Sequence, residues 1–286
     1  MSVAIGIMQG RLSPPANGRI QSFPVATWRE EFALAREAGL ACIEWVYEQE
    51  TARDHPLMTE AGIADLRWLS QQSGITVRSI CADCYMTDRL ITAAGEVRSC
   101  NVTHLRWLMD RAAGLGSRHI VLPFVDGSSL RSQREREALL ALLREVRSDV
   151  ERSGMALHIE SDLSPQEQVR VMTAVNHPLI RITYDMGNCA AAGHDPQEEL
   201  DAIGPWLGSV HVKDRTLGGG TVPLGTGAVD FPACFRIFHE LGFAGPFILQ
   251  AARDSSVTEL EHAKRNRAFV EQYLEQAAWD GSASAR

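Results

Sequence analysis

The sequence predicts an α/β protein built as a single-domain (β/α)8 barrel, or TIM barrel, and two observations lead to this prediction. First, one unit recurs along nearly the whole chain: an amphipathic helix, a glycine at its C-terminal end, and a short β-rich run that ends in a polar or charged residue. Second, eight such runs alternate with helix-sized segments, which indicates parallel βα units. Eight units in about 250 residues are the size of this barrel. A doubly wound sheet is disfavoured, because Met-Gln-Gly-Arg-Leu, and not Gly-x-Gly-x-x-Gly, follows the first run.

The elements follow in order from local signals. The first helix should begin after Thr27 as N-cap, with Glu30 as its capping-box partner, and end at Gly39. A last helix from Thr258 to Ala278 should close the barrel, so the domain covers residues 1–278 and residues 279–286 form a disordered tail. The expected strands are Val3–Met8, Ala41–Trp45, Thr76–Cys81, His119–Leu122, Met155–Glu160, Ile180–Asp185, Gly208–Lys213 and Pro246–Gln250.

Composition excludes several classes of protein. With 28 Lys and Arg against 36 Asp and Glu, the net charge is −8, which argues against a nucleic-acid partner. No apolar run approaches the ~20 residues that span a membrane, and the N-terminus lacks the basic region of a signal peptide. We therefore expect a cytoplasmic protein with no membrane partner. Its six cysteines, scattered over a long chain, should be reduced thiols.

Four consecutive predicted strands carry polar side chains at their carboxyl ends, where active sites of such barrels lie. They are Glu160, Asp185, His211 and Gln250. Each has an ordinary structural explanation by itself, such as an ion pair, a helix cap or a buried histidine. Together they form an oxygen-rich set with one nitrogen, which suits Mn²⁺, Mg²⁺, Co²⁺ or Zn²⁺ and leaves positions for substrate oxygens.

The same residues carry a family resemblance over essentially the whole chain. Ile-Glu160, Tyr-Asp185-Met-Gly-Asn188, Val-His211-Val-Lys213-Asp214 and the stretch Pro223–Gln250 resemble the xylose isomerase-like TIM-barrel superfamily (AP endonuclease family 2-like). Within it, the sequence is most similar to the sugar phosphate isomerase/epimerase group, which contains L-ribulose-5-phosphate and ketohexose 3-epimerases. The superfamily also contains inosose dehydratases, hydroxypyruvate isomerases and apurinic endonucleases.

The resemblance implies one divalent metal ion, Mn²⁺ before the others, held by Glu160, Asp185, His211 and position 250. It implies a small sugar or sugar phosphate as substrate and a homodimer or homotetramer. The ion would polarise the substrate carbonyl, and a carboxylate would remove the neighbouring proton to give a cis-enediolate. In the epimerases, the counterpart of Glu160 and a glutamate at position 250 face opposite sides of that intermediate.

Position 250 departs from the family pattern, because Gln250 can ligate a metal but cannot ionise and carry a proton. The ion should therefore be held less tightly and be a stronger Lewis acid. Three interpretations remain: a single-base aldose–ketose isomerase using Glu160, an epimerase or dehydratase whose second proton carrier lies elsewhere, and a barrel that binds a sugar without catalysis. The candidate carriers are Glu44, Asp83, His158 and His194.

His158 lies two residues before Glu160, so strand periodicity places both side chains on the inner face of the barrel. It is a catalytic candidate, and the alternative is a packed residue in a deeper layer. Substrate contacts are expected from Glu44, Asp83, Tyr85 and Asn188. Arg11, Lys213, Arg215 and Arg253 lie just beyond strand ends and could form an anion pocket, or pair with acidic residues on helices.

Two further functions are weighed against the isomerase. A DNA-repair endonuclease of the same superfamily would need more metal ligands at the ends of strands two to four, but strand four ends in Leu122-Pro123-Phe124 and the net charge is −8. A non-catalytic sugar-binding barrel is compatible with Gln250. It would tolerate loss of the metal, whereas Glu160, Asp185 and His211 have the appearance of a retained metal site.

Overall fold

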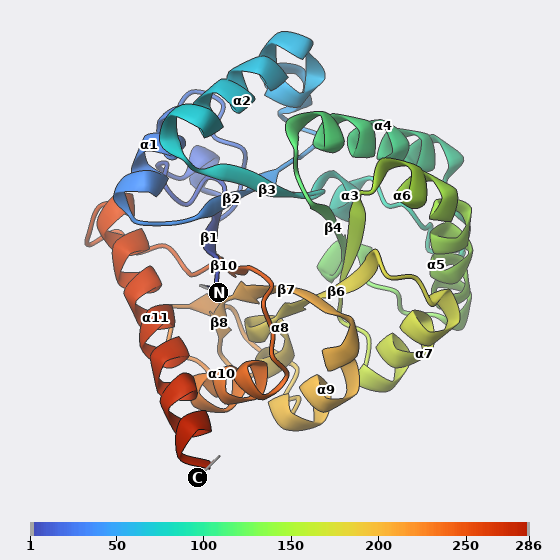
Figure 1. Cartoon of the computed structure of the whole chain (residues 1–286). Helices are drawn as coiled ribbons and strands as arrows, with labels where there is room; N and C mark the ends of the chain where they lie inside the picture. Colours follow the sequence, from blue (N-terminus) through green and yellow to red (C-terminus); the bar gives the residue numbers. More distant parts are fainter. Residues whose placement is uncertain (1–2, 285–286) are drawn as a thin grey trace.

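The computed structural model describes residues 3–284, and the side chains of all of these except 17 and 279–284. Eight parallel strands form a closed barrel in the order β1-β10-β7-β6-β5-β4-β3-β2, which confirms the predicted fold (Figure 1). Their bounds are β1 Ile5–Met8, β2 Cys42–Val46, β3 Thr76–Cys81, β4 His119–Phe124, β5 Ala156–Ser161, β6 Ile180–Asp185, β7 Leu207–Val212 and β10 Phe247–Leu249.

Helices surround the barrel, as Figure 1 shows. The helices are α1 Glu30–Glu37, α2 Glu60–Ser73, α3 Cys84–Thr87, α4 Ser99–Leu115, α5 Gln133–Glu145, α6 Arg147–Ser153, α7 Pro165–Val175, α8 Met186–Ala191, α9 Pro196–Ile203, α10 Phe231–Glu240 and α11 Glu259–Ser284. The helix α11 continues past Ala278, where the tail was expected to begin. Alanines at 277 and 278 are strong helix formers, and a single glycine at 281 costs only about 1 kcal/mol. Residues 285–286 of the expected tail lie outside the described residues.

The start of α1 differs from the prediction. Thr27 does not cap the helix, because its hydroxyl donates to Ser13 Oγ at 2.9 Å. The preceding residues form tight turns in which the backbone N–H of Thr27 and of Trp28 both bond to Pro24 O. The chain therefore enters α1 through turns, and the Thr27 side chain tethers the loop after β1 instead. The predicted end is correct, since Gly39 has a φ of +72°.

The strands are buried on both faces, as expected for a parallel barrel. Side chains that point outward pack under the helices, and those that point inward fall into two groups. The apolar group is Met8, Cys42, Val46, Cys81, Val121 and Ile248. The polar group includes Glu44, Ser79, His119, His158, Thr183, Ser209 and His211, all buried. Several of these buried polar groups bond to one another, among them His211 with Glu44 and His158 with Ser209.

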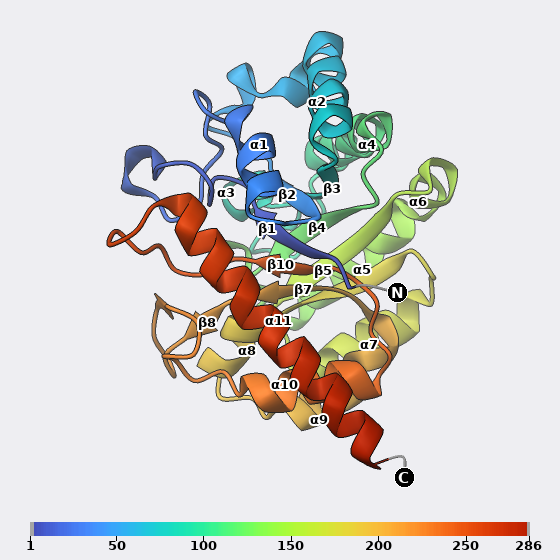
Figure 2. The same cartoon turned by 60° about the vertical axis from the view of Figure 1, so that its left-hand side comes forward.

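Loops from the carboxyl ends of the strands gather at one end of the barrel, on the left in Figure 2. They include the loop after β1, the loop after β10, and the short antiparallel pair β8 (Asp214–Arg215) and β9 (Thr221–Val222). All six cysteines are free, in agreement with the prediction of reduced thiols. None of the described helices is long and apolar enough to cross a membrane.

Candidate functional site

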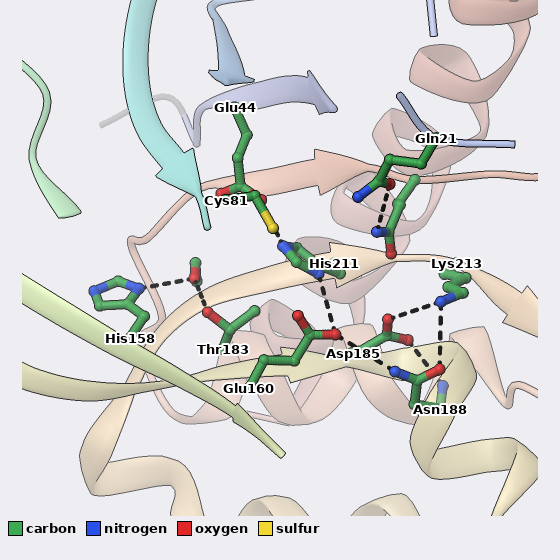
Figure 3. A network of polar contacts seen from close by, with 12 residues as sticks. Gln21, Glu44, Cys81, His158, Glu160, Thr183, Asp185, Asn188, His211 and Lys213 are labelled. Atoms are coloured by element: carbon green, nitrogen blue, oxygen red, sulfur yellow. Dashed lines mark hydrogen bonds and ion pairs between the residues drawn. The ribbon is translucent and has the colours of Figure 1, made fainter. Parts of the chain in front are cut away.

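The structure brings Glu160, Asp185 and His211 together at the carboxyl ends of β5, β6 and β7. Each offers one ligand atom, and these atoms lie within 4.8 Å of one another. All three side chains are buried and point toward a common centre (Figure 3). Two carboxylates and an imidazole this close are a donor set for a divalent cation.

Gln250 directly follows β10 and lines the same cavity as Glu160. Its backbone N–H bonds to Val212 O at 2.9 Å, which continues the pairing of β10 with β7. Its side-chain Nε2 donates to Gln21 Oε1 at 3.0 Å, while Oε1 is buried without a hydrogen-bond partner among the described residues. The amide orientation therefore leaves an oxygen lone pair free, as a metal ligand requires.

His211 is held by a carboxylate on the far side of its ring. Nε2 lies 2.7 Å from Glu44 Oε1, and Ser79 Oγ donates to Glu44 Oε2 at 2.6 Å. Nδ1 is buried with no hydrogen-bond partner among the described residues and lies 3.7 Å from Glu160 Oε1. Histidine ligands of metals usually donate their second N–H to such a carboxylate. The donor set and the two unpartnered atoms, His211 Nδ1 and Gln250 Oε1, fit a divalent metal ion.

The contact between His211 and Glu44 also shifts the pKa of both residues. Burial would lower the pKa of His211, but Glu44 and Glu160 raise it well above its usual value. Burial would raise the pKa of Glu44, but His211, His119 and Ser79 together lower it. The carboxylate of Glu44 is thus ionised and is fully enclosed. Glu44 does not line the cavity, so the structure does not place it where it could bind a substrate hydroxyl.

A second polar layer lies beneath the site and contains His158. Its ring stacks on His119 with centroids 3.8 Å apart, and its Nδ1 lies 2.8 Å from Ser209 Oγ, which also bonds to Thr183. Gly208 makes room, since a Cβ there would lie 2.5 Å from His158 Cε1. Burial keeps the pKa of His158 well below its usual value and lowers that of His119 to about 4. His158 is therefore a neutral residue packed in the layer below the site, as the alternative interpretation of the sequence predicted. It does not line the cavity, so the structure does not support a catalytic role for it.

Above the ligand set lies a cavity of about 340 Å³, the size of a small-ligand site. The predicted site residues that line it are Arg11, Asp83, Glu160, Asn188, Lys213 and Gln250. Arg19, Gln21 and Asp126 line it as well. A neighbouring hollow of about 230 Å³ shares Val125, Asp126 and Asn188 with it and includes Arg215.

Asn188 connects the two carboxylates of the site with two cationic side chains, those of Lys213 and Arg215. Its backbone N–H bonds to Asp185 Oδ1 at 2.8 Å, so Asp185 caps α8, and its Nδ2 donates to Glu160 Oε1 at 3.4 Å. Its Oδ1 accepts from Lys213 Nζ at 3.3 Å and Arg215 Nη1 at 2.8 Å. Lys213 also lies 3.3 Å from Asp185 Oδ2, as Figure 3 shows. Lys213 and Arg215 therefore both have hydrogen-bond partners within the site.

Asp83 is connected to Gln250 through Gln21. Gln21 Nε2 donates to Asp83 Oδ2 at 2.7 Å, and Cys81 Sγ donates to Asp83 Oδ1 at 3.1 Å. Burial raises the pKa of Asp83 to about 6, with Glu160 and Glu48 contributing in the same direction and the two hydrogen bonds opposing it. A carboxyl group with such a pKa exchanges protons readily near neutral pH.

Three other candidates lie away from the cavity. Tyr85 is buried and its hydroxyl lies 2.9 Å from His104 Nδ1, because α3 turns the ring toward α4. Arg253 donates to three backbone carbonyls of the loop after β1. His194 lies in a separate group with Cys189 and Glu199, whose ligand atoms are also within 4.8 Å of one another. None of these side chains is placed to touch a ligand of the metal set.

Sequence reasoning missed Gln21 and Asp126. Gln21 lies in an irregular loop, and no periodicity or motif signals that it reaches Gln250. Asp126 could have been found, since it is the first charged residue after β4. It also has a φ of +49°, a conformation that non-glycine residues seldom adopt outside functional loops.

Comparisons with known proteins agree with the geometry. A family model described as xylose isomerase-like TIM barrel matches residues 32–273. The L-ribulose-5-phosphate 3-epimerase UlaE of Shigella flexneri serotype 5b is 26% identical over 231 residues, which are 78% of this chain and 81% of that protein. A solved L-ribulose 3-epimerase has a TM-score of 0.76 at 18% identity, covering 100% of this chain and 99% of that one. A xylose isomerase-like TIM barrel protein from Mycobacterium smegmatis, solved in complex with magnesium, has a TM-score of 0.70 at 19% identity, covering 96% and 98%.

Proposed function

Because this chain belongs to the xylose isomerase-like TIM barrel family, we propose that it is a divalent-metal-dependent isomerase or epimerase. Its substrate is a sugar or sugar phosphate, and the reaction is proton transfer through a cis-enediolate. One observation carries the proposal: Glu160, Asp185 and His211 converge, and Glu160 lines a cavity together with Gln250. The epimerase activity of the L-ribulose-5-phosphate relative supports the same reaction class.

Glu160, Asp185, His211 and Gln250 would hold the metal ion, through His211 Nδ1 and Gln250 Oε1 among others. When bound, the ion would supply Lewis-acid polarisation of the substrate carbonyl and so acidify the adjacent C–H. Mn²⁺ is our first choice for an oxygen-rich set, and the magnesium complex of a structural neighbour supports a hard divalent ion. Glu44 serves as a positioning residue, because it fixes the His211 ring and leaves Nδ1 as the free nitrogen.

Glu160 acts as the base that removes the proton. It lines the cavity, and Asn188 donates to one of its oxygens at 3.4 Å, which holds the carboxylate toward the ligand centre. Lys213 and Arg215 bond to Asn188 Oδ1 from the other side. This arrangement fixes the amide orientation, so that its NH₂ group and not its oxygen faces Glu160.

Asp83 acts as the second proton carrier in place of the glutamate that the family resemblance implies at position 250. The four candidates from the sequence differ in position: Glu44 is enclosed below His211, His158 is stacked in the lower layer, and His194 lies outside the cavity wall. Asp83 lines the cavity together with Glu160. Gln21 bonds to both Asp83 and Gln250. The carboxyl group of Asp83 is therefore separated from position 250 by one hydrogen-bonded residue.

The test is deuterium incorporation from solvent into a panel of ketoses and ketose phosphates by the Mn²⁺-loaded protein. We expect exchange at the carbon next to the carbonyl for at least one compound, and loss of about 10²- to 10⁴-fold in Glu160→Gln. A matched control is Glu151→Gln, whose side chain is 53% exposed on α6. No exchange across the panel by metal-loaded wild type would overturn the proposal.

A further inference from the structure

The loop after β1 is built into a fixed shape from both sides. Arg253 donates to Gly10 O and Ser13 O at 2.7 Å each, and to Ile20 O at 3.2 Å. From the other side, the buried carboxylate of Glu31 accepts the Gly10 N–H at 2.9 Å. Gly10 itself has a φ of +83°, and a Cβ there would lie 2.5 Å from Ser22 O. Arg11 therefore stands on a backbone that contacts from the loop after β10 and from α1 hold in place.

The guanidinium of Arg11 is held in position without a partner. The residue is only 8% exposed, and its Nε and Nη1 are buried with no hydrogen-bond acceptor among the described residues. Burial, with Arg253 in second place, lowers the pKa of Arg11 to about 10, so it stays a cation at neutral pH. Asp83 is near enough to oppose that shift, but its oxygens are bonded to Gln21 and Cys81. A buried unpaired charge is costly, so a fixed site of this kind indicates an acceptor that arrives from outside.

The other cations around the cavity already have partners. Lys213 lies 3.3 Å from Asp185, and Arg215 bonds to Asn188 and to Gly219 O. Arg19 pairs with Glu48 at 3.0 Å and its side chain is 47% exposed. TIM barrels often bind phosphate with the loops after strands seven and eight, but here the cations after β7 are engaged in the site wall. The cation without a partner among the described residues, Arg11, lies in the loop after β1, and β1 pairs with β10, the strand that Gln250 follows.

We propose that Arg11 is the anion subsite of this cavity and binds the phosphate of a phosphorylated sugar. The inference rests on the proposed function and narrows its substrate class. A guanidinium presents paired N–H donors that match a phosphate in a bidentate way, which explains a partner-free Arg at this point. The sugar oxygens would then face the ligand set of β5, β6, β7 and Gln250, and the phosphate would extend toward the loop after β1.

The experiment is calorimetric titration of wild type, Arg11→Met, Arg11→Lys and Arg19→Met, all with the same metal content. The probes are inorganic phosphate, glycerol 3-phosphate, glycerate and glycerol. We expect Arg11→Met to weaken phosphate and glycerol 3-phosphate by about 10- to 100-fold, with Arg11→Lys between it and wild type. Arg19→Met removes the same charge from the same cavity but from an exposed ion pair, so it should weaken them by less than about twofold.

Thermal unfolding of the ligand-free proteins gives an independent measurement. Arg11→Met should unfold at or above the wild-type temperature, because it removes an uncompensated buried charge. Three results would overturn the proposal: no phosphate binding by wild type, equal weakening in Arg19→Met, or an Arg11→Met protein that is less stable than wild type. Tighter Arg11-dependent binding of glycerate than of glycerol 3-phosphate would overturn the choice of phosphate. These titrations need no turnover, so they can fail or succeed separately from the deuterium exchange.

Discussion

His211 Nε2 lies 2.7 Å from Glu44 Oε1, a contact between residues 167 positions apart in the sequence. Glu44 is enclosed in the middle of β2, and Ser79 on β3 holds its other oxygen. A residue on β2 thus sets the ring orientation of a histidine on β7, the third strand away in the closed barrel. The contact leaves Nδ1 as the nitrogen that faces Glu160 and Asp185.

Replacing Glu44 by Gln should weaken metal binding by about 10- to 100-fold, because the amide supplies no negative charge to hold the imidazole. Isothermal titration of Mn²⁺ into the metal-free protein measures this. Ser79→Ala is the matched control, since it removes one hydrogen bond to Glu44 but keeps the carboxylate. Unchanged affinity in Glu44→Gln would show that the carboxylate does not orient His211.

Asp83→Asn should abolish net epimerisation while Glu160-dependent deuterium exchange continues. The reason is that Glu160 alone can remove and return a proton on one face, whereas inversion needs a carrier on the other. We expect a fall of at least about 10²-fold in product formation and a much smaller change in exchange, both followed by NMR in D₂O. Equal loss of both would mean that Asp83 has a different role.

Gln250→Glu should bind the metal ion more tightly, by roughly tenfold or more, because a third carboxylate lowers the net charge of the site from zero to −1. Without metal, the same variant should unfold at a lower temperature, since the new carboxylate stands among Glu160 and Asp185. Gln250→Met is the contrasting variant, as it keeps the length and removes the oxygen. A Gln250→Glu protein that binds Mn²⁺ no better than wild type contradicts this prediction.

Glu31 should make the protein less stable as the pH rises. Burial raises the pKa of Glu31 from 4.5 to about 7, and the Gly10 N–H bond opposes this only in part. Between these values the folded protein keeps a proton that the unfolded chain releases, so stability is greatest below about pH 4.5 and is lost up to about pH 7. The loss corresponds to roughly 3 kcal/mol.

Urea unfolding of wild type and Glu31→Gln at pH 5 and pH 8 measures this contribution. The variant should match wild type at pH 5 and exceed it at pH 8, because its amide is neutral at both. All other ionisable groups are the same in both proteins, so the difference in stability between the two reports Glu31. A constant difference between the two proteins at both pH values would exclude the proposed titration.

The fold was predictable because most of the strands are short buried runs that follow a glycine-terminated helix. Helix ends such as Gly116 and Gly154 adopt positive φ, at +89° and +67°, so the local signal and the structure coincide. The candidate ligand set was predictable for a related reason: in a parallel barrel, residues at the carboxyl ends of the strands reach the same rim. Glu160, Asp185 and His211 needed only the strand ends to be located.

The other roles depend on contacts that sequence periodicity does not encode. Strand alternation places His158 on the inner face, but it does not say how deep, and depth decides between a packed layer and a cavity wall. Glu44 has the position of a substrate contact and is instead covered by His211 from across the barrel. Gln21 reaches Gln250 because the loop that carries it is fixed by Arg253 and Glu31, which lie far away in the sequence.

Arg253, after the last strand, fastens the loop that follows the first. A ribosome makes Gly10 243 residues before Arg253. A nascent chain that stops before residue 253 therefore lacks these bonds, and the part of the cavity that Arg11 lines takes its shape only after residue 253 has emerged. Limited proteolysis of stalled chains should cut within residues 10–20 when they end at 250, and spare that segment once α11 has emerged.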